Sequence, residues 1–159
     1  DNQEGWDRLL QVASFFEPMT LTSGPGISED NPAELIGYRY PLITVYADTS
    51  ADEVYNFVKA MHEQFEAYQG AHPRMFAWAP DMAGVPPADA PFHEGAVRYF
   101  KEIGVWTEEH DAWNEGRMAR MQAVQEAWEA ANDAAFDEGI SDSDWPAFWQ
   151  EHRSKALGG

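Results

Sequence analysis

The stretch Pro91–Trp106, PFHEGAVRYFKEIGVW, limits most narrowly how this chain can fold. Its apolar side chains recur at spacings of three and four residues, which predicts a short amphipathic helix over His93–Ile103. The residues that share the apolar face are Ala96, Val97, Phe100 and Ile103. Gly104 is expected to end the helix in the left-handed conformation, and Val105 and Trp106 should then fold back onto it. These residues predict a compact packing unit rather than a catalytic signature.

The acidic composition excludes several classes of partner. The chain has 10 Lys and Arg against 28 Asp and Glu, which gives a formal net charge of −18. Nucleic acids and anionic lipid surfaces are bound through Lys and Arg, so neither is an expected partner. No apolar run approaches the ~20 residues of a membrane span, so we expect no direct membrane insertion.

The length and residue usage fit one globular domain or part of one. The 159 residues are 44% hydrophobic, which is enough to form a packed core. There is no cysteine, and this excludes disulfides, thiolate nucleophiles and cysteine-ligated metals. The first residues, DNQ, are neither a Met start nor a signal peptide, so we expect a chain processed or excised from something larger.

The N-terminal two thirds of the sequence predicts helices around one good strand. Apolar spacing predicts a helix over Gly5–Phe16, and weak alternation in Met19–Ser23 is compatible with a short strand. Asn31–Glu34 reads as a helix start, with an N-cap, a proline and an acid. Leu42–Ala47 is short, β-branched and aromatic, as in a strand covered on both faces. A capping box at Ser50 opens a helix expected to run to about Gln69.

The C-terminal third is expected to be helical. Thr107 should cap a long helix from Glu108 to about Asp137, which Gly139 ends, and Ser141 or Ser143 should cap the last helix. The whole sequence therefore shows about five helices and one convincing strand. A lone strand cannot satisfy its backbone groups, so we expect its sheet partners to lie in sequence outside this chain.

Candidate catalytic and metal sites are not supported by the residue patterns. His62 and Glu66 share a helix face without a third ligand nearby, so an ordinary solvated pair is the favoured interpretation. His93-Glu94 does not continue into HExxH, and His93 is expected to hydrogen-bond at the helix start. No nucleophile or nucleotide-binding signature is present. We therefore expect no enzyme activity, no metal and no cofactor.

The stretch predicted to lie nearest a ligand is Thr20–Gly26, TLTSGPG. Its hydroxyls and glycines would let backbone amides approach an anion such as a carboxylate, although the same residues also fit a plain connecting loop. Tyr38, Tyr40 and Tyr46 flank the predicted strand and could reach a cleft or be buried in the sheet. The candidate ligand-binding residues are Thr20, Thr22, Ser23, Gly24 and Tyr38.

Four stretches, in the same order, resemble the TAXI family of solute-binding proteins, which serve tripartite ATP-independent periplasmic (TRAP) transporters. They are Trp6–Pro18, Ile36–Ala47, Ser50–Phe65 and Pro91–Gly104. In the last of them, the family's His, Gly-Ala pair, aromatic pair and Glu-x-Gly are matched by His93, Gly95, Ala96, Tyr99, Phe100, Glu102 and Gly104. The sequence SGPGISEDN at 23–31 departs from the family's Tyr-Pro-Gly element, so that ligand contact is not carried over.

The resemblance implies an α/β fold: the C-terminal part of a two-lobed, periplasmic-binding-protein-like (type II) receptor. This part would be mostly helical, with one or two strands and a long helix near the C-terminus. Residues 1–37 would end the second lobe and cross over, residues 38–105 would return to the first lobe, and residues 106–159 would form a helical extension. The implied protein is periplasmic, captures a small carboxylate or amino-acid solute and delivers it to TRAP membrane subunits. The alternative is a stand-alone acidic helical domain that docks a partner protein through its Trp-rich C-terminal helices.

Overall fold

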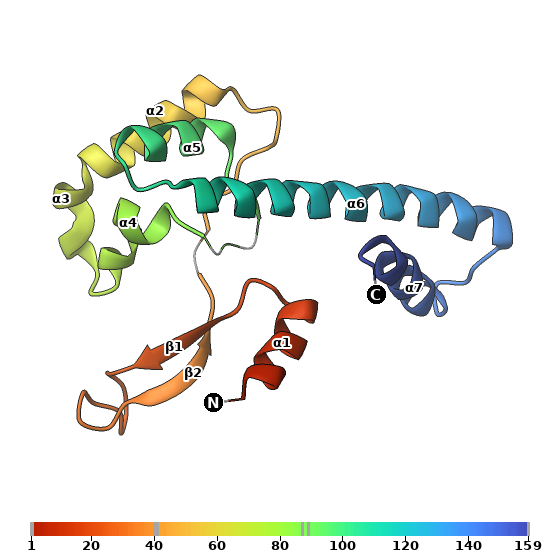
Figure 1. The fold of residues 1–159 in the computed structure, drawn as a ribbon, viewed down its shortest axis with the longest axis horizontal. Helices are drawn as coiled ribbons and strands as arrows, with labels where there is room; N and C mark the ends of the chain where they lie inside the picture. The colour runs from red at the N-terminus through yellow and green to blue at the C-terminus, as the bar shows by residue number, and fades with distance from the viewer. Residues whose placement is uncertain (1, 40–41, 87, 89, 159) are drawn as a thin grey trace. The chain divides into compact units, whose positions relative to one another are not determined.

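The computed structural model of the protein describes residues 2–39, 42–86, 88 and 90–158 (Figure 1). The chain packs as two compact units, residues 1–107 and residues 108–159. In the part that the structure describes, helices predominate, and the sheet is a single antiparallel pair of strands. The expectation of a mostly helical segment with one or two strands and a long helix is confirmed at this level.

The first helix, α1 (Gln3–Val12), is shorter than predicted. The Asn2 side chain accepts a hydrogen bond from the Gly5 amide at 2.9 Å and caps its start. The helix ends at Val12 rather than Phe16. The next strand begins at Glu17, whose position before Pro18 biases it toward extended backbone.

An antiparallel hairpin follows, formed by β1 (Glu17–Leu21) and β2 (Ala33–Gly37). The weak strand signal near Met19 is therefore confirmed. The predicted helix start at Asn31–Glu34 is wrong, because Ala33 and Glu34 pair with Leu21 and Thr20 across the hairpin. Pairing with a distant segment has overridden the local capping signal.

The predicted strand at Leu42–Ala47 is also wrong. These residues form no strand, and no described segment pairs with them. Ile43 is 54% exposed and Tyr46 is 85% exposed. The side chains suit a strand, but a strand exists only where a neighbour satisfies its backbone groups, and within residues 42–86 and the other described ranges none does.

The core of the first unit is formed by α2 (Ala51–Glu63) and α5 (Glu94–Glu102), which pack side by side (Figure 1). Gly95 makes this close approach possible, since a Cβ at this position would lie 2.2 Å from the Ala51 carbonyl oxygen. The buried hydrophobic residues of this core are Val54, Ala96, Tyr99, Phe100 and Trp106. The predicted compact unit around Pro91–Trp106 is thus the centre of the fold.

Short helical turns connect these two helices. They are α3 (Phe65–Tyr68), the 3₁₀ helices η1 (Gln69–Ala71) and η2 (Met75–Trp78), and α4 (Pro80–Ala83). The long helix predicted from Ser50 to Gln69 is therefore interrupted at Gln64, and the Ser50 side chain makes no capping hydrogen bond. In the loop between α4 and α5, residues 87 and 89 lie outside the described residues.

The end of α5 is formed as predicted. Gly104 has φ +77°, in the left-handed region that only glycine enters at low cost. The Val105 and Trp106 amides both donate to the Phe100 carbonyl, at 3.0 and 3.2 Å. Trp106 thereby returns to α5 and stacks on the Phe100 ring, with 6.4 Å between the ring centroids.

The second unit is a pair of helices, α6 (Glu108–Glu138) and α7 (Trp145–Ala156). The predicted long helix is confirmed, and Gly139, with φ +68°, follows its last residue. Trp128 of α6 meets Trp145 and Trp149 of α7 edge to face, with centroids 5.2 and 5.0 Å apart. Ala131, which is fully buried, lies one turn of α6 beyond Trp128.

Candidate functional site

Thr20, the first predicted ligand-binding residue, lies within β1 opposite Glu34 of β2. Its hydroxyl donates to the Glu34 carboxylate at 2.8 Å. Both side chains are exposed, and the pair stabilises the hairpin as a cross-strand contact.

Thr22, Ser23 and Gly24 lie exposed in the loop beyond β1. Gly24 also begins a four-residue turn that ends at Ile27, whose amide donates to the Gly24 carbonyl at 3.0 Å. Pro25 and Gly26 occupy its central positions, and Gly26 has φ +75°, as a type II turn requires. Proline and glycine thus set the local shape of the loop and leave the hydroxyls of its first arm facing solvent.

Tyr38 lies at the other end of the hairpin. It follows Gly37, which pairs with Glu17, whereas Ser23 lies two residues beyond Leu21. At ~3.4 Å per strand residue, Tyr38 and Ser23 are more than about 15 Å apart. The structure therefore brings Thr22, Ser23 and Gly24 together but does not bring Tyr38 to them.

Arg39, next to Tyr38, was not singled out by the sequence. Its guanidinium is partly buried, and Nη1 donates to the Val85 carbonyl at 2.5 Å. Burial lowers the pKa of Arg39, and the nearby Glu17 opposes that change. A guanidinium remains charged in proteins and has five N–H donors, so this residue could hold a carboxylate. No local motif marks it, because its partner lies 46 residues away.

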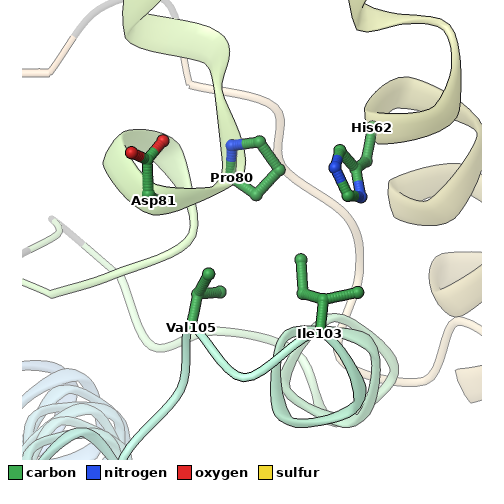
Figure 2. A pocket seen from close by; sticks show the side chains of 5 residues that line it. All are labelled: His62, Pro80, Asp81, Ile103 and Val105. Atoms are coloured by element: carbon green, nitrogen blue, oxygen red, sulfur yellow. The ribbon is translucent and has the colours of Figure 1, made fainter.

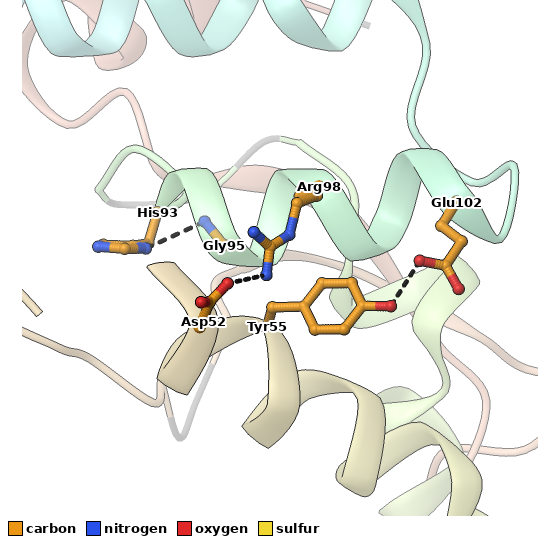
Figure 3. Close-up of polar contacts among 6 residues, drawn as sticks. All are labelled: Asp52, Tyr55, His93, Gly95, Arg98 and Glu102. Carbon is orange, nitrogen blue, oxygen red and sulfur yellow. Dashed lines mark hydrogen bonds and ion pairs between the residues drawn. The ribbon is translucent and has the colours of Figure 1, made fainter. Parts of the chain in front are cut away.

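Two histidines have structural roles. His93 accepts a hydrogen bond from the Gly95 amide through Nδ1 at 3.1 Å, so the predicted role at the helix start is confirmed (Figure 3). His62 Nδ1 shares a hydrogen bond of 2.7 Å with the Tyr99 hydroxyl. Within the described ranges, no group of three or more metal-ligating side chains gathers.

Polar side chains also bridge α2 and α5 along their exposed edge, as Figure 3 shows. Arg98 binds Asp52 at 2.8 Å and lies over the Tyr55 ring at 4.3 Å from its centroid. The Tyr55 hydroxyl donates to Glu102 at 2.5 Å, and this hydrogen bond is the main cause that raises the pKa of Tyr55. All of these polar groups are engaged with one another, so the cluster holds two helices together rather than presenting a reactive group.

An open hollow lies beside this core, with a volume of about 230 Å³. Figure 2 shows Pro80 and His62 facing Ile103 and Val105 across it, with Asp81 at its edge. Pockets that enclose a small molecule usually measure ~300–1,000 Å³, so this hollow is smaller than a usual ligand site. It was not predicted, because it joins residues of α2, α4 and the segment after α5 that are far apart in the sequence.

Residues 2–104 match the model of the NMT1-like family, a periplasmic-binding-type family related to solute-binding proteins. The chain belongs to the NMT1-like family. No curated protein and no solved structure matches the chain. The NMT1-like family indicates an extracytoplasmic solute-binding role at a coarse level, with a small molecule as the ligand.

The matched residues take in all of the first unit except its two ends, and they include every predicted ligand-binding residue. The match ends at Gly104, so α6 and α7 lie outside it. In the part of the chain that the structure describes, no helix has both the length and the apolar character needed to cross a membrane.

Proposed function

We propose that the chain is the C-terminal half of the solute-binding receptor of a TRAP transporter, of the TAXI type. The receptor would capture a small carboxylate or amino-acid-like solute in the periplasm and deliver it to the membrane subunits. The observation that carries the proposal is the NMT1-like match over residues 2–104, together with the TAXI-like order of residues in His93–Gly104.

The exposed stretch Leu42–Ala47 supports the two-lobed part of this proposal. It has no charged residue and no proline, and the side chains of its apolar residues are exposed. Such residues are typical of an inner strand of a sheet covered on both faces. In the complete receptor this stretch would pair with strands of the first lobe.

The ligand class is supported by the chemistry of the hairpin. The hydroxyls of Thr22 and Ser23 are exposed, and the partly buried cation Arg39 follows Tyr38. An anionic solute would find donors at either end of the hairpin, and we place it at the Thr22–Gly24 end. The mechanism would be closure of two lobes around the solute, which shifts an open–closed equilibrium by binding the closed form more tightly.

The test is a thermal-shift screen of organic acids and amino acids against the full-length receptor. A ligand at about one hundred times its Kd stabilises the folded form by ~2.7 kcal/mol and should raise the Tm by several degrees. The affinity of the receptor for the stabilising compound should fall at least tenfold when Thr22→Val and Ser23→Ala are combined. Ser28→Ala, a hydroxyl removed elsewhere in the loop, is the matched control. A full-length receptor that no compound of either class stabilises would contradict the proposal.

No specific contact favours catalysis. Thr20, His93 and Tyr55 are held in hairpin, cap and helix-bridging hydrogen bonds, and we propose no enzyme activity.

A further inference from the structure

Helix α6 presents an exposed apolar stripe. The exposed fractions are 53% for Met118, 49% for Met121, 44% for Trp128 and 87% for Phe136. At 3.6 residues per turn these four side chains fall within about a quarter of the helix circumference. The stripe is ~27 Å long, since 18 residues separate its ends. We call these four residues the α6 stripe.

The stripe has one rigid anchor and flexible neighbours. The Trp128 ring is held edge to face by Trp145 and Trp149 of α7, so little conformational freedom is lost when a partner covers it. Methionine side chains adapt to irregular apolar surfaces and are common where proteins bind one another. An anchored indole beside two methionines is therefore suited to receive a partner side chain.

Acidic residues run along one edge of the α6 stripe. They are Glu115, Glu126, Glu129 and Asp133, which lie next to the stripe on the helix circumference. Glu126 and Glu129 accept hydrogen bonds from the amides of Gln122 and Gln125, which are neutral donors and leave the charge uncompensated. Among the described ion pairs, none includes these four carboxylates. Carboxylates three and four residues apart on a helix repel one another, and a cation from a partner would relieve that repulsion.

We propose that the α6 stripe and its acidic edge form a docking surface for a basic amphipathic helix of another protein. Apolar side chains of the partner would cover the stripe, and its Lys or Arg would lie against the acidic edge. A second copy of this chain fits less well, because it would bring another acidic edge to the same place. The surface lies outside the family match at residues 2–104, so the inference goes beyond the proposed solute binding and does not depend on it.

The probe is a synthetic helix of leucine and lysine, with leucines at every third and fourth position and a length of about 18 residues to match the stripe. Its binding to the full chain is measured by fluorescence anisotropy. The lysine peptide should bind, and its affinity should fall as salt rises. A matched peptide with glutamate at every lysine position should bind at least tenfold more weakly.

Two variants locate the binding. The first variant combines Met118→Lys with Met121→Lys and should lower the affinity for the lysine peptide at least tenfold. The second combines Glu126→Gln, Glu129→Gln and Asp133→Asn and should lower that affinity at least tenfold as well. All of the changed side chains are exposed, so the fold should be retained, and circular dichroism checks this.

Matched controls lie in the first unit. Met82→Lys changes another exposed methionine, and Glu29→Gln, Asp30→Asn and Asp48→Asn together remove the same number of charges. These controls should change the affinity less than twofold. The proposal is overturned if the wild-type chain does not bind, or if stripe and control variants lose affinity equally. A dimer in sedimentation experiments that Met121→Lys abolishes would assign the surface to a second copy and would also overturn it.

Discussion

The α2–α5 core and the stretch Leu42–Tyr46 are both rich in apolar and aromatic residues, yet they have opposite fates. Tyr99 and Phe100 of α5 are buried against α2 and Trp106, whereas Ile43 and Tyr46 are exposed. Hydrophobic composition gives a segment the tendency to be buried, but burial requires a complementary surface. Helices α2 and α5 cover each other's apolar side chains. Among the described residues, no segment covers Leu42–Tyr46 in this way.

This difference should be visible as a difference in sensitivity to mutation. Full burial of a large apolar side chain contributes about 1.5–3 kcal/mol relative to exposure, and a cavity left behind adds to the loss. Substitutions in the core should therefore be costly, and substitutions in Leu42–Tyr46 should leave the free energy of unfolding nearly unchanged.

The largest expected effect is that of Phe100→Ala. The ring stacks on Trp106 and meets Phe92 edge to face, so its removal leaves a cavity at the centre of the first unit. We expect a loss of about 3–5 kcal/mol in the free energy of unfolding, measured by urea titration. Phe76→Ala, at a ring that is 51% exposed, is the control and should cost less than about 1 kcal/mol. Equal losses would mean that Phe100 is not a core residue.

Gly95→Ala tests the close approach of α5 to α2. The added Cβ would lie 2.2 Å from the Ala51 carbonyl oxygen and 2.9 Å from the Tyr55 nitrogen. Since these are backbone atoms, the helices must separate, and we expect a loss of about 2–3 kcal/mol by thermal or urea unfolding.

Gly116→Ala is the matched control for that change. Gly116 lies within α6, and a Cβ there meets no atom within 4 Å. Alanine should stabilise the helix by ~0.5–1 kcal/mol. If both alanines stabilised the chain, the close α2–α5 contact would be refuted.

Tyr99→Phe should have a smaller effect, because it removes one hydrogen bond and keeps the ring. The His62 nitrogen loses its partner, and we expect a loss of about 1–2 kcal/mol at neutral pH. A variant as stable as the wild type would show that this hydrogen bond contributes nothing to folding.

The same residue should affect alkaline unfolding. Burial, followed by the charges of Glu63 and Glu102, raises the pKa of Tyr99 above its usual value of 10.0. The folded state then holds the phenol proton more tightly than the unfolded state, so this contribution is complete below about pH 10 and is lost as pH rises through the higher folded pKa. Tyr99→Phe should flatten the decline in stability above pH 10, measured as Tm against pH.

The smallest expected effect belongs to Ile43→Lys combined with Val45→Lys. Both side chains are exposed, so the free energy of unfolding should change by less than about 0.5 kcal/mol. Urea titration checks this, and a loss of 2 kcal/mol or more would show that the stretch is packed in solution. In the full-length receptor proposed above, the same pair of lysines should be strongly destabilising.

Predictions from sequence succeeded where the decisive contacts are local. The cap by His93, the left-handed Gly104 and the returning Trp106 all lie within one short segment, so residue type and spacing were sufficient. The end of α6 before Gly139 was likewise predicted from residues within one short segment. Local chemistry determines such features before any distant segment is placed.

Predictions failed where distant pairing decides. Asn31–Glu34 has the signals of a helix start, but the register with β1 makes Ala33–Gly37 a strand. The predicted ligand residues shared a short span of sequence, and the hairpin nevertheless separates Tyr38 from Ser23. Arg39 was overlooked for the same reason, since only the fold shows its contact with Val85. The ligand role of the hairpin residues stays a prediction.

The three indoles where α6 meets α7 make the second unit optically distinct. Because the Trp128 ring lies 5.2 Å from that of Trp145 and 5.0 Å from that of Trp149, nearly perpendicular to each, their electronic transitions should couple and give a circular dichroism band that isolated tryptophans lack. Loss of that band on heating would report the melting of one unit alone, without any attached dye.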